Sequence, residues 1–171
     1  MGEQRAKYIL KCPADGQIIK RNSLTLGLTK MSTRTRVQRG SLLEELPEAE
    51  QPQDSTKIAL VGIDCKSLRL DIQCDFPHNT CNPRWTKTLT RLSDEETNFL
   101  LAISSLEERF ETFNTRLDLG RVISLGSYVY VSVKGKGHLP GVVWYKGELP
   151  SNSGTMFGVE LCVSMSAFIN F

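Results

Sequence analysis

The sequence predicts an α+β protein in which a small curled sheet, or open barrel, follows one amphipathic helix and a partly disordered N-terminal half. Three observations lead to this prediction. Three short apolar runs follow one another between residues 126 and 161, with glycines at the bends between them. An apolar stripe at helical spacing precedes these runs, over residues 92–119. Residues 31–57 are charged and poor in apolar side chains, as in a linker.

Residues 1–57 are expected to form a mixed, disordered segment and linker. Only Tyr8-Ile9-Leu10 and an alternation of leucines at 24, 26 and 28 suggest local order before residue 31. A basic cluster follows, and then an acidic stretch with two prolines over residues 44–54. The basic cluster consists of Arg34, Arg36 and Arg39. Composition favours a solvated tail over a surface that contacts an acidic protein or RNA.

Residues 58–91 are expected to contain short strands and a loop. Ile58-Ala59-Leu60-Val61-Gly62-Ile63 is a continuous apolar run of strand length, and Leu68, Leu70 and Ile72 alternate with polar residues. Asp64-Cys65-Lys66-Ser67 is expected to turn the chain between them.

The loop carries a group of thiols that suggests a metal site. Cys74, His78 and Cys81 are close in sequence, and Cys65 is a possible fourth ligand. Structural zinc is usually held by two close ligand pairs, and the spacing here is irregular and lacks a Cys-x2-Cys pair. The sequence therefore favours unrelated thiols on a loop, and we predict no metal.

Residues 92–119 carry the signals of one amphipathic helix. Ser93 as N-cap and Glu96 three residues later form a capping box. Gly120 follows the last turn, as is usual at a helix C-terminus. The stripe between these ends is expected to pack against the small sheet rather than to bind a partner, because so short a barrel buries little by itself. Its members are Phe99, Ile103, Leu106, Phe110, Phe113 and Leu117.

Residues 120–171 hold the strongest strand signals. Val129, Val131 and Val133 alternate with Tyr128, Tyr130 and Ser132, which predicts a strand with one aliphatic and one mixed face. Gly135-Lys136-Gly137 is expected to turn the chain back into a second strand containing Val142-Val143-Trp144-Tyr145. A third run extends from Met156 to Leu161.

These strands resemble a CAP-Gly domain, which implies an SH3-like barrel. The matching elements are Gly126, Pro140-Gly141-Val142-Val143, Gly147 and Gly158-Val159-Glu160-Leu161. Upstream, Phe99-Leu100-Leu101-Ala102-Ile103 and Glu107-Glu108-Arg109-Phe110 are similar to the N-terminal region of a family of CAP-Gly-containing cysteine-type deubiquitinases. The family's Gly-Lys-Asn-Asp-Gly loop and closing strand do not follow Leu161. The resemblance therefore implies a product that ends within its first CAP-Gly domain.

The resemblance implies a groove that accepts acidic or aromatic C-terminal peptides, as on tubulin. Its candidate residues here are Lys146, Met156, which stands where most of the family has Trp, and Phe157. Without the glycine-rich loop the groove is expected to be incomplete and to bind such tails weakly. Signalling scaffold proteins are the other class of partner that the resemblance implies, and the expected location is cytoplasmic, with possible association with the cytoskeleton.

No catalytic constellation is apparent in the sequence. His78 and His138 are the only histidines, and pairing either of them with one of the five cysteines has no basis in the spacing. Whether the protein is an enzyme stays open, because the resemblance implies that a longer form is a cysteine-type deubiquitinase. Within this chain we predict no catalytic residue and no cofactor.

The charge balance bears on two further classes of partner. Twenty-one Lys and Arg against 19 Asp and Glu give a net charge of +2, which does not favour nucleic-acid binding by bulk charge. No apolar run approaches the roughly 20 residues of a membrane span. The favoured function is non-catalytic protein interaction in ubiquitin signalling. The alternatives are the deubiquitinase activity of a longer form and nucleic-acid binding through Arg34, Arg36 and Arg39.

Overall fold

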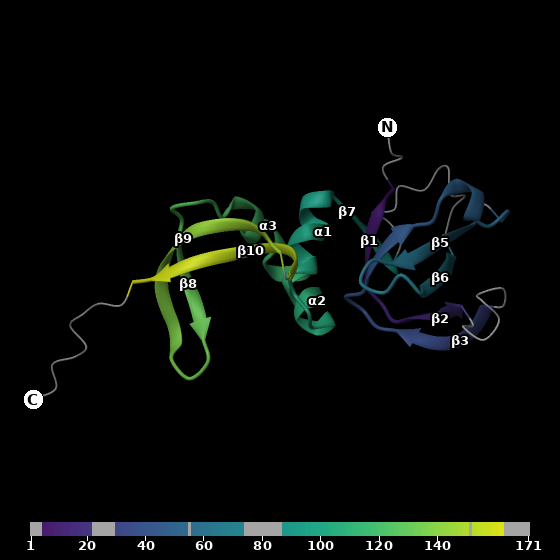
Figure 1. Cartoon of the computed structure of the whole chain (residues 1–171), viewed down its shortest axis with the longest axis horizontal. Helices are drawn as coiled ribbons and strands as arrows, with labels where there is room; N and C mark the ends of the chain where they lie inside the picture. The colour runs from purple at the N-terminus through teal and green to yellow at the C-terminus, as the bar shows by residue number, and fades with distance from the viewer. Residues whose placement is uncertain (1–4, 22–29, 55, 74–86, 151, 163–171) are drawn as a thin grey trace, which may run out of the picture.

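The structure, a computed structural model, describes residues 5–21, 30–54, 56–73, 87–150 and 152–162. Two antiparallel sheets lie on either side of a group of three helices (Figure 1). The predicted α+β class is confirmed, with one correction: neither sheet closes into a barrel. The predictions for leucines 24, 26 and 28 and for Cys74, His78 and Cys81 concern residues outside the described ranges.

The N-terminal sheet has seven strands in the order β3-β2-β6-β5-β4-β1-β7. β5 and β6 form the hairpin that the sequence predicted, with Leu60 opposite Leu70. The strands are β1 (Lys7–Leu10), β2 (Ala14–Arg21), β3 (Lys30–Val37), β4 (Leu42–Glu45), β5 (Lys57–Gly62), β6 (Leu68–Gln73) and β7 (Leu89–Leu92).

A long bent hairpin flanks the β5–β6 pair on both sides. Its first arm is β1 followed by β2, and its second arm is β3 followed by β4. β1 pairs with β4 on one side of the pair, and β2 pairs with β3 on the other. The bend in the second arm falls at Gly40, whose φ of 84° is open to glycine and strained for other residues. An added Cβ at Gly40 would lie 2.0 Å from the carbonyl oxygen of Leu106, so the bend also brings the sheet against a helix.

The expected disorder of residues 31–57 is wrong. These residues contain most of β3, all of β4 and a short 3-10 helix, η2 (Glu48–Glu50). Three apolar side chains of the segment, Val37, Leu42 and Leu43, are buried, whereas Met31 is exposed. Composition was misleading because the strands pair with β1, β2 and β5, and these long-range contacts offset the entropy of ordering a polar segment.

The predicted single helix is instead three helices: α1 (Asp94–Leu101), α2 (Leu106–Thr115) and α3 (Leu117–Val122). The predicted capping box is present, because the Ser93 side chain accepts from the Glu96 N–H and Glu96 bonds back to the Ser93 N–H. A second N-cap, Ser105, accepts from the Glu108 N–H and begins α2. The chain turns between α1 and α2, so the stripe does not run along one axis.

The stripe packs on both sheets, and not on the small sheet alone. Leu117 is buried with Ile9 and Leu42 of the N-terminal sheet, and Phe110 and Phe113 pack against the same cluster. The ring of Phe99 meets Phe157 of the small sheet edge to face, with ring centroids 5.9 Å apart. The two most buried side chains of α1, Leu100 and Thr97, are outside the predicted stripe.

The second sheet has three strands in the order β10-β9-β8. They are β8 (Tyr128–Val133), β9 (Gly137–Leu149) and β10 (Asn152–Leu161), and they contain the three predicted runs. The predicted glycine turn joins β8 to β9, where Gly135 and Gly137 both have positive φ. Val143 is the single described side chain of this sheet that is a buried hydrophobe. So little burial means that the sheet depends on the helices for its stability.

Candidate functional site: an exposed aromatic face on the small sheet

Four aromatic side chains of β8 and β9 are exposed on the small sheet. Tyr128 is 84% exposed, Tyr130 78%, Trp144 66% and Tyr145 40%. We call these four side chains the aromatic face. Large side chains of this kind are usually placed where they remove apolar area from water, so a group of exposed ones is a candidate for an interaction surface.

The strand register places these residues on one side of the sheet. Tyr128 pairs with Val142, and Tyr130 pairs with Pro140. Directly paired residues lie on the same side of a sheet, and Trp144 follows Val142 by two residues along β9. The register with β10 shifts opposite Trp144, between Gly158 and Val159. A bulge of this kind re-aims side chains, and it lets both Trp144 and Tyr145 face solvent.

Tyr145 lies over two glycines. An added Cβ at Gly158, its partner on β10, would be 2.9 Å from the Tyr145 Cβ, and one at Gly147 would be 2.9 Å from the phenolic oxygen. The hydroxyl donates to the Glu148 carbonyl oxygen over 2.6 Å. Gly147 and Gly158 therefore leave the space in which the Tyr145 ring lies against the sheet. These are two of the glycines that match the CAP-Gly pattern in the sequence.

The opposite side of the sheet contacts the helices at β10 and the second half of β9. Lys146 and Phe157 are directly paired there, and the Lys146 Nζ lies 5.7 Å from the centroid of the Phe157 ring. The Lys146 ammonium also donates to three carbonyl oxygens at the C-terminal end of α3, those of Gly120, Arg121 and Ile123. A cation suits this end because the last carbonyls of a helix have no intrahelical partner.

The structure thus places two of the three predicted groove residues at a helix junction. Lys146 and Phe157 contact each other and the helices. Met156 precedes Phe157 on β10 and pairs with Gly147 of β9. Because successive residues of a strand point to opposite sides of the sheet, Met156 lies toward the side away from Phe157. The exposed lysines near this sheet are Lys134 and Lys136, in the β8–β9 turn. The sequence predicted that Tyr128 and Tyr130 lie on the mixed face of a strand. It gave no sign that no other described residue covers them.

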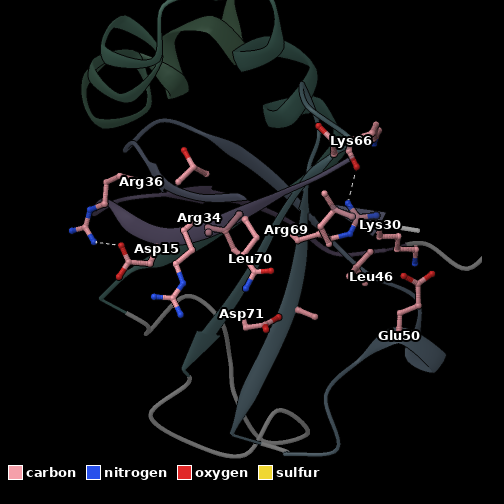
Figure 2. A pocket seen from close by; sticks show the side chains of 16 residues that line it. Asp15, Lys30, Arg34, Arg36, Leu46, Glu50, Lys66, Arg69, Leu70 and Asp71 are labelled. Atoms are coloured by element: carbon pink, nitrogen blue, oxygen red, sulfur yellow. Dashed lines mark hydrogen bonds and ion pairs between the residues drawn. The ribbon is translucent and has the colours of Figure 1, made fainter. Parts of the chain in front are cut away.

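A second feature is a hollow in the N-terminal sheet, about 1160 Å³ in volume (Figure 2). Its lining includes Lys30, Arg34 and Arg36 of β3, with Asp15, Asp71 and Glu50 among them. The predicted basic cluster is divided here. Arg39 points elsewhere, donating to Glu107 of α2 and lying 5.0 Å from the centroid of the Phe110 ring.

The described thiols show no catalytic arrangement. Cys12, Cys65 and Cys162 are free and exposed. The Cys65 Sγ lies 3.2 Å from the Ser67 Oγ, and this hydrogen bond lowers the pKa of the Cys65 thiol. Among the described residues, no group of three or more His, Cys, Asp or Glu is arranged to hold a metal ion. None of the described helices has the length and apolar character that a membrane crossing requires.

Comparison with known proteins relates part of the chain to one class, the ubiquitin carboxyl-terminal hydrolases. The particular relatives are CYLD of Mus musculus, CYLD of Bos taurus and CYLD of Homo sapiens, each 40% identical over 81 residues. The matched stretch is 44% of this chain, and it is 8% of the length of each relative. No family model matches the chain, and no solved structure matches it significantly.

These comparisons confirm the predicted resemblance to a deubiquitinase family, over part of the chain. The small sheet has the three strands that the apolar runs predicted, and it does not close into the barrel that the CAP-Gly resemblance implied. The CAP-Gly assignment itself stays a prediction. The chain spans a small fraction of its relatives, so their activity is considered below only as a proposal.

Proposed function

We propose that this chain is a non-catalytic protein-interaction module, and that the aromatic face is its contact surface. The observation that supports the proposal is the exposure of Tyr128, Tyr130 and Trp144 on the side of the sheet opposite to the one where Lys146 and Phe157 contact the helices. Tyrosine and tryptophan are enriched at the centres of protein interfaces, because each gives a large rigid apolar area with a polar tip.

The partners that we propose are proteins of ubiquitin signalling, in the cytoplasm and at the cytoskeleton. The resemblance to CYLD, whose name describes a ubiquitin hydrolase, supports the first part. We keep acidic tails of the tubulin type as weak ligands. Lys146 supports this expectation, because its ammonium is engaged with carbonyls of α3 and is not free to receive a terminal carboxylate.

A selection experiment tests the aromatic face. A displayed peptide library is selected on the chain, and the enriched peptides are measured against Tyr128→Ser/Tyr130→Ser/Trp144→Ser. The matched control is Lys134→Ser/Lys136→Ser, which alters exposed residues of the adjoining turn. We expect affinity to fall about tenfold or more in the triple variant and to be unchanged in the control, because loss of even one Tyr or Trp hot spot costs about 2 kcal/mol and about 1.4 kcal/mol is tenfold in affinity.

The fluorescence of Trp144 gives a direct readout. The chain has two tryptophans, so a Trp85→Phe background isolates Trp144. We expect its emission to shift to shorter wavelength as bound peptide covers the ring. Peptides that bind the wild type and the triple variant equally well, or a library from which nothing is enriched, would overturn the proposal.

The tail expectation is tested by titrating a tubulin-type C-terminal peptide at physiological salt. We expect a dissociation constant well above 1 μM, which corresponds to about −8 kcal/mol. Binding near 1 μM that disappears when the terminal carboxylate is amidated would show a working groove and contradict this expectation.

A second candidate function is cysteine-type deubiquitination by a longer form of the protein. The similarity to a named ubiquitin carboxyl-terminal hydrolase favours it. The proposal assigns that activity to sequence outside this chain. Purified chain is therefore expected to leave linear and lysine-linked polyubiquitin intact. Cleavage that is abolished by a Cys→Ser change within the chain would place the activity here instead.

A further inference from the structure

The β2–β3 hairpin concentrates positive charge in a nearly neutral chain. The hairpin, residues 14–37, contains one acidic residue, Asp15, although the whole chain has 19 Asp and Glu. The same residues include five basic side chains: Lys20, Arg21, Lys30, Arg34 and Arg36. The charge of this hairpin is therefore a local property that the net charge of +2 conceals.

β3 is also an edge strand. It stands at the end of the seven-stranded sheet and, among the described residues, pairs with β2 alone, from Ala14 opposite Val37 to Arg21 opposite Lys30. Its first five residues are exposed, Lys30 to Arg34. In an antiparallel edge strand every second residue turns its backbone N–H and C=O away from the only neighbour, so β3 presents a row of groups that can pair with a further strand.

The basic side chains of β3 share one face and have few competing partners. Lys30, Arg34 and Arg36 are separated by even numbers of residues, so their side chains lie on the same face of β3. All three line the hollow of Figure 2. Within the described part of the chain, neither Lys30 nor Arg34 takes part in an ion pair. Arg36 pairs with Asp15 at 2.8 Å, with side chains 57% and 90% exposed, so water already competes for this pair.

We propose that β3 is a docking edge for an extended acidic peptide, which adds to the N-terminal sheet as a further strand and places alternate carboxylates beside Lys30, Arg34 and Arg36. Backbone pairing along the edge supplies binding that does not depend on sequence, and opposite charges directly across the two strands select for acidic residues. The same positive charge repels a second basic edge, which disfavours pairing between two copies of β3.

A peptide fits this edge better than a nucleic acid does. Residues 14–37 contain no aromatic side chain on which a base could stack. A peptide backbone brings N–H donors as well as acceptors, so it satisfies both kinds of group on an open strand edge.

The test uses the full chain and a fluorescein-labelled octapeptide of alternating Val and Glu, followed by anisotropy. Three further probes are a Val-Gln peptide, a Val-Glu peptide with alternate N-methylated amides, and a short DNA duplex. We expect binding of the Val-Glu peptide that weakens as salt is raised, and little binding of the other three. N-methylation keeps the charges but removes the N–H donors that strand addition needs.

The variant Arg34→Gln/Arg36→Gln is expected to weaken peptide binding about tenfold, because two charge-assisted contacts are lost. Its matched control is Arg91→Gln/Arg116→Gln, which removes the same charge from exposed positions away from β3. Hydrogen exchange of residues 30–37 is expected to slow on binding of the peptide.

Several results would overturn the proposal: no binding of the Val-Glu peptide, equal binding of its N-methylated form, equal loss in the control variant, or tighter binding of the duplex than of the peptide. The aromatic face is unaltered in all these variants, so the outcome is independent of the proposed function above.

Discussion

At the scale of single residues, Arg109 connects parts of the chain that are far apart in sequence. Its side chain is 2% exposed. The guanidinium donates to the carbonyl oxygens of Leu100 and Ile103 and, over 2.6 Å, to the Asp64 carboxylate. A further contact of 3.4 Å reaches the Gly40 carbonyl oxygen. Arg109 therefore donates to carbonyl oxygens at the C-terminal end of α1 that have no partner within the helix. It also holds α2 against the turns of the N-terminal sheet that contain Gly40 and Asp64.

Arg109→Leu is expected to lower the free energy of unfolding by about 1–3 kcal/mol, because it removes the side-chain donors of the Ile103 and Gly40 carbonyl oxygens. The Asp64 carboxylate adds less, since its side chain is 42% exposed and stays in contact with water. The matched control is Arg116→Leu, at an exposed position one residue beyond α2, and it should change stability by about 0.5 kcal/mol or less. Urea denaturation of the two variants makes the comparison. Equal midpoints would mean that the Arg109 contacts contribute no net stability.

The neighbouring contact between Arg39 and Glu107 provides a prediction about pH. The hydrogen bond from Arg39 lowers the pKa of the Glu107 carboxyl and raises the pKa of Arg39. A carboxyl with a depressed folded pKa stabilises the fold above its unfolded pKa, about 4.3, and this contribution is lost as pH falls through the folded value. The raised pKa of Arg39 adds no further change in this acid range, because its contribution is fully present there.

The coupling between Arg39→Gln and Glu107→Gln in a double-mutant cycle is therefore expected to be present at neutral pH and absent once the Glu107 carboxyl is protonated. Glu111→Gln, exposed on the same helix, replaces Glu107→Gln in the control cycle. A coupling that persisted at low pH would show that the two side chains interact by packing and not through charge.

At the scale of elements, local signals were predictable and partners distant in sequence were not. The capping box of Ser93 and Glu96 could be read because both residues lie within one turn. The second N-cap, Ser105, was not predicted, because the apolar stripe keeps its helical spacing on both sides of this residue and hides the break between α1 and α2. The register of a stripe also gives no sign of Leu100, which is fully buried only because Ile9 and Leu42 of the N-terminal sheet approach it.

The burial of Leu100 and the partial exposure of Phe110 predict which of two alanine substitutions destabilises the fold more. Leu100→Ala is expected to cost about 2–5 kcal/mol, because it opens a cavity in an apolar cluster. Phe110 was predicted to be core, but the structure leaves it half-buried beneath Arg39, so Phe110→Ala should cost less than Leu100→Ala. Thermal or urea unfolding ranks the two. The reverse order would mean that Phe110 is the central side chain of the helices.

At the scale of the whole molecule, the sequence predicted the small sheet and missed the larger one. Turn residues and alternation identify hairpins between neighbouring strands, such as β8–β9 and β5–β6. The N-terminal sheet depends on pairing between β1 and both β4 and β7, whose register is set by tertiary contacts. The candidate site was missed for a similar reason, since exposure of Tyr128 and Tyr130 depends on what the rest of the fold leaves uncovered.

The helices are held to the small sheet by a close backbone approach at Gly154 of β10. Its φ is 90°, and an added Cβ would lie 2.3 Å from the Asn98 carbonyl oxygen and 2.4 Å from the Ala102 nitrogen. Gly135, in the β8–β9 turn, has a similar φ of 78° but nothing within 4 Å of an added Cβ. The two glycines therefore share the same backbone requirement and differ in whether a helix stands against them.

Gly135→Ala is expected to cost about 1–2 kcal/mol, the strain of a left-handed conformation in a residue with a side chain. Gly154→Ala adds a clash with helix backbone that no side-chain rotation can relieve, so α1 and β10 must separate, and it should cost at least about 2 kcal/mol more. Because the damage lies between α1 and the small sheet, hydrogen exchange should accelerate in β8, β9 and β10 while β5, in the core of the N-terminal sheet, stays protected. Equal costs for the two glycine variants, or equal loss of protection in β5 and β10, would show that the close approach does not support the small sheet.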